Sequence, residues 1–317
     1  MARRYIFLGL LAAMLSLAGL NTMALGQLKF GTSVGWSPPY YLPVIAAEEK
    51  GFWKQAGLEA EWVPFRGSSV MYRAVAAGSI GIGFTDTSAA IQAASRGIPV
   101  LIVADTGAGS PFSLFVKGNS PIKRAKDLRG KTIGLGRFGG GHHAYTRYMI
   151  KQAGLEGKIK YVALGGMRAR IAALKTGSAD TIVTTADSVA NLVATGELRE
   201  VVSAADYLPR EWSYLIISAS REMIKNSPDK ISKAVKAILL ASAFINGHRT
   251  WAIDKMQAKG LSRDGAREVA KRLRYSEDGK INRKALENVR KFLIDYKIVK
   301  RGKIPETADL YTDRFTR

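Results

Sequence analysis

The chain contains a long internal repeat. Residues 63–97 read VPFRGSSVMYRAVAAGSIGIGFTDTSAAIQAASRG, and residues 162–196 read VALGGMRARIAALKTGSADTIVTTADSVANLVATG, aligned without a gap. The identical pairs include Gly67/Gly166, Gly78/Gly177, Ser79/Ser178, Thr85/Thr184 and Gly97/Gly196. Two similar units of this size predict two similar lobes with a ligand between them.

Each unit alternates strand patterns with helix patterns. In the first unit the expected strands are 28–34, 58–65, 80–84 and 100–104, and the expected helices are 44–50, 67–77 and 88–96. In the second unit the strands are 132–135, 160–164 and 181–184, and the helices are 144–153, 167–176 and 188–194. Such alternation predicts α/β lobes, each with a parallel sheet covered by helices. The prolines Pro38 and Pro39 predict a loop over 35–40.

The rest of the chain is expected to join the lobes and to cover lobe one. A strand at 214–218 is expected to rejoin the first sheet, and basic helices are expected over 229–253, 263–273 and 283–296. The predicted organisation is a signal peptide over 1–26, lobe one over 27–115, lobe two over 116–212, and the return to lobe one with C-terminal helices over 213–317. The lobes are therefore expected to be Rossmann-like and linked by two crossing strands.

The first 26 residues have the pattern of a secretory signal peptide. Arg3 and Arg4 precede an apolar run over 6–20, and small residues lead to a cleavage point near Gly26/Gln27. The general export route is favoured over the twin-arginine route, and the run is short for a membrane span. The sequence has no cysteine, which excludes disulfides and a lipid-bearing cysteine. We expect a periplasmic protein that is free of the membrane.

The chain is strongly basic. It has 48 Lys and Arg against 26 Asp and Glu, a formal net charge of +22. Nucleic acid is the usual partner of such a surface, but an exported protein favours small anions or acidic membrane faces. The basic faces of the C-terminal helices are predicted to be solvated rather than to bind nucleic acid, because aromatic residues are sparse among them. No nucleic-acid partner is expected. Nucleic-acid binding would weaken steeply with added salt, and absence of this salt dependence would exclude this partner.

Ligands of open parallel sheets bind where strands lead into helices. In lobe one, Arg66 and Gly67-Ser68-Ser69 could bind an anion at a helix N-terminus, although an ordinary serine cap and a surface arginine explain them equally well. In lobe two, the glycines before His142 indicate a close backbone approach, with His142 donating to a ligand or bonded only to water. The adjacent histidines do not predict a metal pair.

Other loop residues have competing explanations. Tyr40 could stack on a flat ligand or pack in the core, and Asp86 and Asp187 could bind an amine, with helix capping favoured for both. The set expected to contact a ligand is Ser37, Tyr40, Arg66, Gly67, Ser68, Ser69, Thr85, Asp86, Thr87, Arg137, Gly141, His142, Gly166, Met167 and Asp187. Arg66 aligns with Gly165 in the repeat, so the charged donor is on the lobe-one side. Lobe one is therefore expected to capture the anionic end of the ligand, and lobe two to close over the rest.

Several motifs occur in a characteristic order: residues 46–53 (AAEEKGFW), Ala56-Gly57-Leu58, Gly67-Ser68-Ser69, Ala77-Gly78 and 128–131 (LRGK). In the order and spacing of these motifs, the chain resembles the periplasmic substrate-binding proteins of ATP-driven (ABC) importers. The resemblance is to the branch that includes sulfonate, taurine and nitrate binders and NMT1/THI5-like proteins. The resemblance implies a type II periplasmic-binding-protein fold, one small organic ligand, and delivery to a permease with a cytoplasmic ATPase. One departure is Gly81, which stands where lobe two keeps the acidic Asp180.

An enzyme is not expected. The chain has no cysteine and no His-Glu-x-x-His sequence, and the pyrimidine-synthase-like enzymes of the branch depend on cysteine-rich chemistry. The alternative is an enzyme on the same fold that acts on a small organic acid or a pyrimidine precursor and uses His142 or His143. No cofactor or metal is expected, and the protein is expected to be a monomer.

Overall fold

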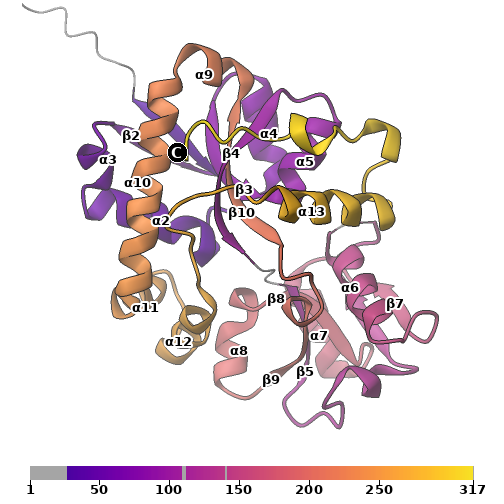
Figure 1. Cartoon of the computed structure of the whole chain (residues 1–317). Helices are drawn as coiled ribbons and strands as arrows, with labels where there is room; N and C mark the ends of the chain where they lie inside the picture. Colours follow the sequence, from indigo (N-terminus) through magenta and orange to yellow (C-terminus); the bar gives the residue numbers. More distant parts are fainter. Residues whose placement is uncertain (1–26, 109–111, 140, 317) are drawn as a thin grey trace, which may run out of the picture.

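The structure is a computed structural model and describes residues 27–108, 112–139 and 141–316, so the predicted signal peptide (1–26) lies outside the described residues. These residues form two separate five-stranded sheets, each with its own helices. Figure 1 shows the two sheets in different halves of the molecule, with a narrow waist between them. We call the half with the first sheet lobe one and the half with the second sheet lobe two.

The first sheet has the strand order β2-β1-β3-β10-β4. Its strands are β1 (Leu28–Thr32), β2 (Ala60–Pro64), β3 (Ile82–Asp86), β4 (Val100–Ala108) and β10 (Ser213–Ser220). Strand β1 pairs in parallel with β2 and β3, whereas β10 runs antiparallel to both β3 and β4. The C-terminal segment lies beside β4, where Ile102 N–H donates to the Leu310 carbonyl at 2.9 Å and so covers this edge.

The second sheet repeats this plan with the order β7-β6-β8-β5-β9. Its strands are β5 (Phe112–Lys117), β6 (Thr132–Leu135), β7 (Lys160–Ala163), β8 (Thr181–Thr185) and β9 (Leu198–Ser203). Strand β6 pairs in parallel with β7 and β8, and β5 runs antiparallel to β8 and β9. Each sheet therefore receives one antiparallel strand from a segment that connects the lobes. This is the two-lobed α/β architecture of the type II periplasmic-binding-protein fold.

The first boundary between the lobes differs from the expected residue 115/116. Strand β5 begins at Phe112 and already pairs with β8 and β9, so the chain leaves lobe one before Phe112. The sequence pattern could not place it, because an apolar strand fits either sheet equally well. At the return, β10 starts at Ser213 between β3 and β4.

The helices follow the expected alternation, except that the short helices α3 and α9 are additional, one helix begins earlier and another is broken. Their bounds are α2 (Pro38–Glu49), α3 (Phe52–Gln55), α4 (Ser68–Ala76), α5 (Thr87–Ser95), α6 (Gly141–Gln152), α7 (Met167–Thr176), α8 (Ala190–Ala194), α9 (Arg221–Asn226), α10 (Pro228–Gly247), α11 (Arg249–Ala258), α12 (Arg263–Arg272) and α13 (Arg283–Asp295). The loop expected over 35–40 ends before Pro38, where α2 begins. Proline lacks a backbone N–H, but in the first turn of a helix that N–H would have no intrahelical partner, so proline is tolerated there. The single helix expected over 229–253 is broken at His248.

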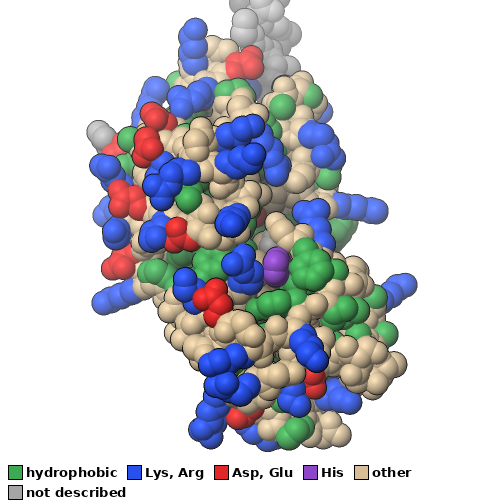
Figure 2. Space-filling view, turned by 90° about the vertical axis from the view of Figure 1, so that its right-hand side faces the viewer, with side chains coloured by type: hydrophobic (Ala, Val, Ile, Leu, Met, Phe, Trp, Pro, Cys, Tyr) green, Lys and Arg blue, Asp and Glu red, His purple; other side chains and the backbone are tan. Residues whose placement is uncertain are grey.

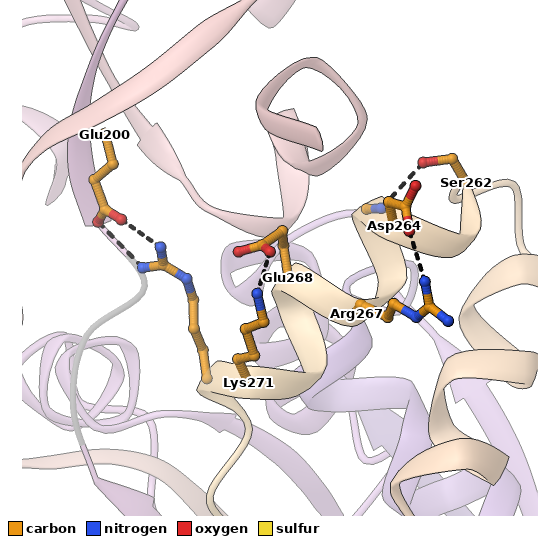
Figure 3. Close-up of polar contacts among 8 residues, drawn as sticks. Glu200, Ser262, Asp264, Arg267, Glu268 and Lys271 are labelled. Carbon is orange, nitrogen blue, oxygen red and sulfur yellow. Dashed lines mark hydrogen bonds and ion pairs between the residues drawn. The ribbon is translucent and has the colours of Figure 1, made fainter. Parts of the chain in front are cut away.

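The C-terminal helices contact both lobes. Helix α10 packs on α2 in lobe one, whereas α12 packs on α8 in lobe two. At the α12 end Arg272 donates its Nη1 to Glu200 Oε1 of β9 at 3.1 Å, and at the α12 start Ser262 N–H donates to Asn191 Oδ1 of α8 at 2.9 Å. Figure 3 shows Glu200 and the polar residues of α12 along this contact. Helix α12 is thus tied to lobe two by side-chain bonds.

Helix α13 closes the core of lobe two from the lobe-one side. Its Phe292 packs among Tyr145 and Trp212, with the ring centroids of Phe292 and Tyr145 4.8 Å apart. The same helix also contacts α5 of lobe one. In Figure 1 it lies across the waist, above α6. The two lobes therefore share packed side chains besides the connecting strands.

Candidate functional site

A cavity of about 880 Å³ lies between the lobes, and both lobes line it. Lobe one contributes the loop before α2, the start of α4 and the start of α5, and lobe two contributes the starts of α6 and α7 and the end of β8. Figure 2 shows the waist hollowed, with a histidine and basic side chains at its edge. Of the expected contact residues, the cavity wall includes Ser37, Tyr40, Arg66, Gly67, Ser68, Ser69, Asp86, Arg137, Gly141, His142, Met167 and Asp187.

Three expected residues do not reach the wall. Thr87 is buried, and its hydroxyl lies 2.8 Å from Ser213 Oγ, so it joins α5 to β10. Thr85 is fully buried at the end of β3, and Gly166 precedes α7 on the exposed side of the loop.

The wall of lobe one has a carboxylate at its base. Asp86 Oδ1 accepts from Ala89 N–H at 2.8 Å, so the expected cap of α5 is confirmed, and Asp86 Oδ2 accepts from Ser68 Oγ at 3.3 Å. Burial raises the pKa of Asp86, against the lowering effect of these hydrogen bonds. Arg66, by contrast, is exposed at the mouth.

A second carboxylate joins the two lobes directly. Ser37, just before α2, donates its hydroxyl to Asp187 Oδ2 of lobe two at 2.9 Å. Burial raises the pKa of Asp187 as well. The expectation that Asp187 caps a helix is wrong: a short 3₁₀ turn begins at Asp187 itself, so its side chain is free to reach across the cavity to Ser37.

The wall of lobe two is basic. His142 sits in the first turn of α6, and its ring centroid lies 4.8 Å from that of Phe112. Burial, together with the nearby Arg170 and Arg137, lowers the pKa of His142 to about 4. His142 is therefore neutral at neutral pH. One of its ring nitrogens can then donate a hydrogen bond, and the other can accept one.

Arg170 is the buried charged residue that the sequence analysis missed; the exposed Arg73 and Arg96 of lobe one also line the cavity and were not expected there. The Arg170 side chain is 6% exposed, lines the cavity, and donates one Nη1–H to the Val183 carbonyl, while its Nε has no hydrogen-bond partner. Burial lowers the pKa of its guanidinium. Lobe two thus holds a buried cation in addition to the expected Arg137, so the expectation from the aligned loops that the start of α7 lacks charge is wrong.

The repeat contained the signal for Arg170. In the ungapped alignment Arg170 stands opposite Met71, which is fully buried in the core of lobe one. An arginine at a position whose counterpart is a core methionine is costly to bury, and such a substitution suggests a function. Other wall residues that were missed are tyrosines on core-facing positions, whose patterns match ordinary packing: Tyr72, Tyr145 and Tyr214.

Within the described part of the chain, no three His, Cys, Asp or Glu side chains are grouped as a metal site would need. Nor does any helix there combine the length and apolar character of a membrane span. Basic side chains are spread over the face drawn in Figure 2 rather than gathered in one patch.

Comparison with protein families identifies the chain. The profile of the family described as NMT1/THI5 like matches residues 38–249, which include both sheets' parallel strands except β1 and all of the cavity-lining loops from α2 to β8. The chain belongs to the NMT1/THI5-like family. The resemblance expected from the sequence is therefore confirmed.

Known NMT1/THI5-like relatives include an enzyme and a binding protein. The chain is 31% identical over 110 residues to the 4-amino-5-hydroxymethyl-2-methylpyrimidine phosphate synthase THI5 of Saccharomyces cerevisiae, covering 33% of this chain and 32% of that protein. It is 33% identical over 107 residues to the riboflavin-binding protein RibY of Chloroflexus aurantiacus, covering 33% and 30%. The chain thus matches about a third of the length of these curated relatives.

The fold of this NMT1/THI5-like chain extends to more distant proteins. The periplasmic aliphatic sulphonate binding protein SsuA of Escherichia coli superposes with a TM-score of 0.77 at 19% identity, over 90% of this chain and 92% of that one. This similarity covers both lobes. It confirms the expected two-lobed periplasmic-binding-protein fold.

Proposed function

We propose that the protein is the solute-binding component of an ATP-driven importer and captures a small anionic organic solute of the sulfonate, nitrate or carboxylate class between its lobes. The observation that carries the proposal is the cavity of about 880 Å³, whose wall is divided between the lobes and includes Arg66, Arg137 and Arg170. A site split in this way is completed only when the lobes approach each other, which couples solute binding to a change of shape that a permease can recognise.

The expected site chemistry supports an anionic solute. The start of α4 offers free backbone N–H groups beside Ser68 and Ser69, and the start of α7 offers the same beside Met167. Arginine can bind a carboxylate or sulfonate through two parallel hydrogen bonds. The two lobes would then contribute N–H donors to opposite sides of one solute.

A thermal-shift panel of sulfonates, nitrate, carboxylates and pyrimidines tests this proposal on the purified mature chain. A solute at 100 times its Kd stabilises the folded state by about 2.7 kcal/mol, which is a measurable shift of Tm. Absence of a shift with every class would overturn the proposal.

The proposal includes the location and the partners. We propose export through the predicted signal peptide, cleavage near Gly26/Gln27, a monomer in the periplasm, and delivery to a permease with a cytoplasmic ATPase. Mass spectrometry of the protein from a periplasmic extract tests the cleavage. A mature chain that still carries residues 1–26 would contradict it.

The alternative function is an enzyme on this fold. The partial match to the yeast synthase supports this alternative. His142 is a weak base with its pKa near 4. Residues 31–35 (GTSVG) also have the letter pattern of a nucleophile elbow, but Ser33 is fully buried, unlike the exposed serine of an elbow. If the wild-type protein turns over an organic acid or a pyrimidine precursor and alanine at both His142 and His143 abolishes this while binding survives, the enzyme is established.

A further inference from the structure

The cavity contains two buried carboxylates without a cationic partner. Asp86 and Asp187 both line it, and neither has a Lys, Arg or His nitrogen within 4.0 Å among the described residues. Each accepts a serine hydroxyl instead, Asp86 from Ser68 and Asp187 from Ser37. A buried carboxylate whose only partners are neutral donors leaves its charge uncompensated.

Three tyrosines lie near the Asp86 carboxylate. Tyr40, Tyr72 and Tyr214 line the cavity, and the charge of Asp86 is close enough to raise the pKa of all three phenols in addition to the effect of burial. The face of an aromatic ring attracts a cation within about 6 Å of its centroid. A carboxylate among tyrosines is therefore a site for a positively charged nitrogen.

The opposite charge is buried in lobe two without a counterion. Arg170 has no carboxylate within 4.0 Å among the described residues, and its Nε has no partner. Arg137 lines the same wall and lies close enough to His142, as Arg170 does, to lower its pKa. This wall can bind an anionic group at the start of α7.

The acidic and the basic groups face one cavity and do not pair with each other. Lobe one supplies Asp86 with its tyrosines. Lobe two supplies the buried Arg170 with Arg137, as well as Asp187. The other arginines of the wall belong to lobe one and are exposed: Arg66, Arg73 and Arg96. The charges of Asp86 and Arg170 are both compensated only by a solute that carries a cationic and an anionic group. A solute with an anionic group alone would leave Asp86 uncompensated and close to that added negative charge.

We propose that the solute is a small zwitterion, with a protonated or quaternary nitrogen held by Asp86 and its tyrosines in lobe one and a carboxylate or sulfonate held by Arg170 in lobe two. This inference rests on the proposed solute-binding function and narrows the solute class. It reverses the polarity that the repeat alone suggests, since the anionic end lies against lobe two. Closure of the lobes would then bring the two charged ends of one molecule to their partners.

Matched pairs of solutes test the inference by calorimetric titration. Each pair differs only in the cationic nitrogen: 3-aminopropanesulfonate against propanesulfonate, 4-aminobutanoate against butanoate, and glycine betaine against 3,3-dimethylbutanoate. We expect the zwitterion of at least one pair to bind about tenfold or more tightly than its partner, which is the scale of a hydrogen bond to a buried charge. If the simple anions bind as tightly as the zwitterions in every pair, the inference is wrong while the solute-binding function stands.

Two variants assign the ends of the bound zwitterion. Asp86→Asn keeps an oxygen to cap α5 and removes the charge, so we expect it to reduce the affinity for the zwitterion to that of its uncharged-end partner. Arg170→Gln should weaken both members of the pair by about tenfold or more. Arg168→Gln, an exposed arginine on α7 that does not line the cavity, is the matched control and should leave both affinities unchanged.

The outcomes separate the two proposals. Equal losses of both members in Asp86→Asn would show that Asp86 does not bind the nitrogen and would overturn the inference. If no member of any pair binds and the wider thermal-shift panel also shows no shift, the solute-binding function itself fails. If the wider panel finds only solutes without a cationic nitrogen, the function holds and the zwitterion is excluded.

Discussion

At the scale of residues, the site depends on charges buried without partners. Arg170 occupies the place that Met71 occupies in the other half of the repeat. A core position that accepts methionine in one lobe holds a guanidinium in the other. Burial of this charge costs stability, and we propose that a bound anion compensates the cost.

We predict that Arg170→Met raises the free energy of unfolding by about 1–3 kcal/mol while it lowers the affinity for anionic solutes. Methionine has a similar length and needs no counterion, and the same side chain packs at the equivalent site of lobe one. Urea denaturation and calorimetric titration measure the two effects. A loss of stability instead would mean that the bond of Arg170 to the Val183 carbonyl serves the fold rather than the site.

His142 gives a second prediction at this scale. Burial and two arginines lower its pKa to about 4, so the ring stays neutral from pH 8 down to about pH 5. NMR titration of the ring should show no midpoint near the usual 6.5. A midpoint for His142 near 6.5 would mean that the ring is open to water.

At the scale of elements, the contact between α12 and α8 fixes how the C-terminal helices hold lobe two. Gly265 is buried against this contact, and a Cβ there would lie 2.4 Å from Asn191 Oδ1 and 3.2 Å from the Ala190 carbonyl carbon. The absence of a side chain allows the two helices to approach this closely. The Arg272–Glu200 pair then fixes the other end of α12 (Figure 3).

We predict that Gly265→Ala destabilises the fold by about 1–3 kcal/mol through this clash. The matched control is Gly247→Ala at the end of α10, where a Cβ meets nothing within 4 Å and alanine should stabilise by a few tenths of a kcal/mol to about 1 kcal/mol. Thermal unfolding of the two variants should move Tm in opposite directions. Equal shifts would contradict the close approach of α12 and α8.

The sequence predicts most elements and misses those set by tertiary context. The strands and helices of the repeat follow from periodicity, because both halves bury the same faces. Helix α2 begins at Pro38 rather than at the expected residue 44, because proline is tolerated in its first turn. Strand β9 escapes the pattern because its sequence, LREVVS, neither alternates nor forms a continuous apolar run, and it lies at the edge of the sheet. Buried Arg170 escapes because a charged residue is normally predicted to be exposed.

At the scale of the whole molecule, stability depends on pH through buried acids. Burial raises the pKa of Asp105 in β4 from 3.8 to about 6, although Gly107 N–H donates to it at 3.1 Å. Between these two values the folded state binds more protons than the unfolded state. The contribution of Asp105 to stability therefore increases as the pH falls from about 7 to about 4.

We predict that Asp105→Asn is more stable than the wild type at pH 7, by up to about 3 kcal/mol, and that this advantage disappears near pH 4. The asparagine carbonyl can still accept from Gly107 N–H, so the change isolates the charge. Urea denaturation of both proteins across this pH range measures the difference. A constant difference at all pH values would show that the Asp105 carboxyl is not the titrating group.

The plan of the two sheets also determines the order in which they can be completed. All five strands of the second sheet lie between residues 112 and 203, whereas the first sheet needs β10, which begins only at residue 213. As the chain emerges in order from the ribosome, the lobe that comes second in sequence is the first to possess its whole sheet. Its aromatic seal, Phe292 of α13, is synthesised only after β10 of the first sheet, so the lobe that can complete its sheet first is closed late.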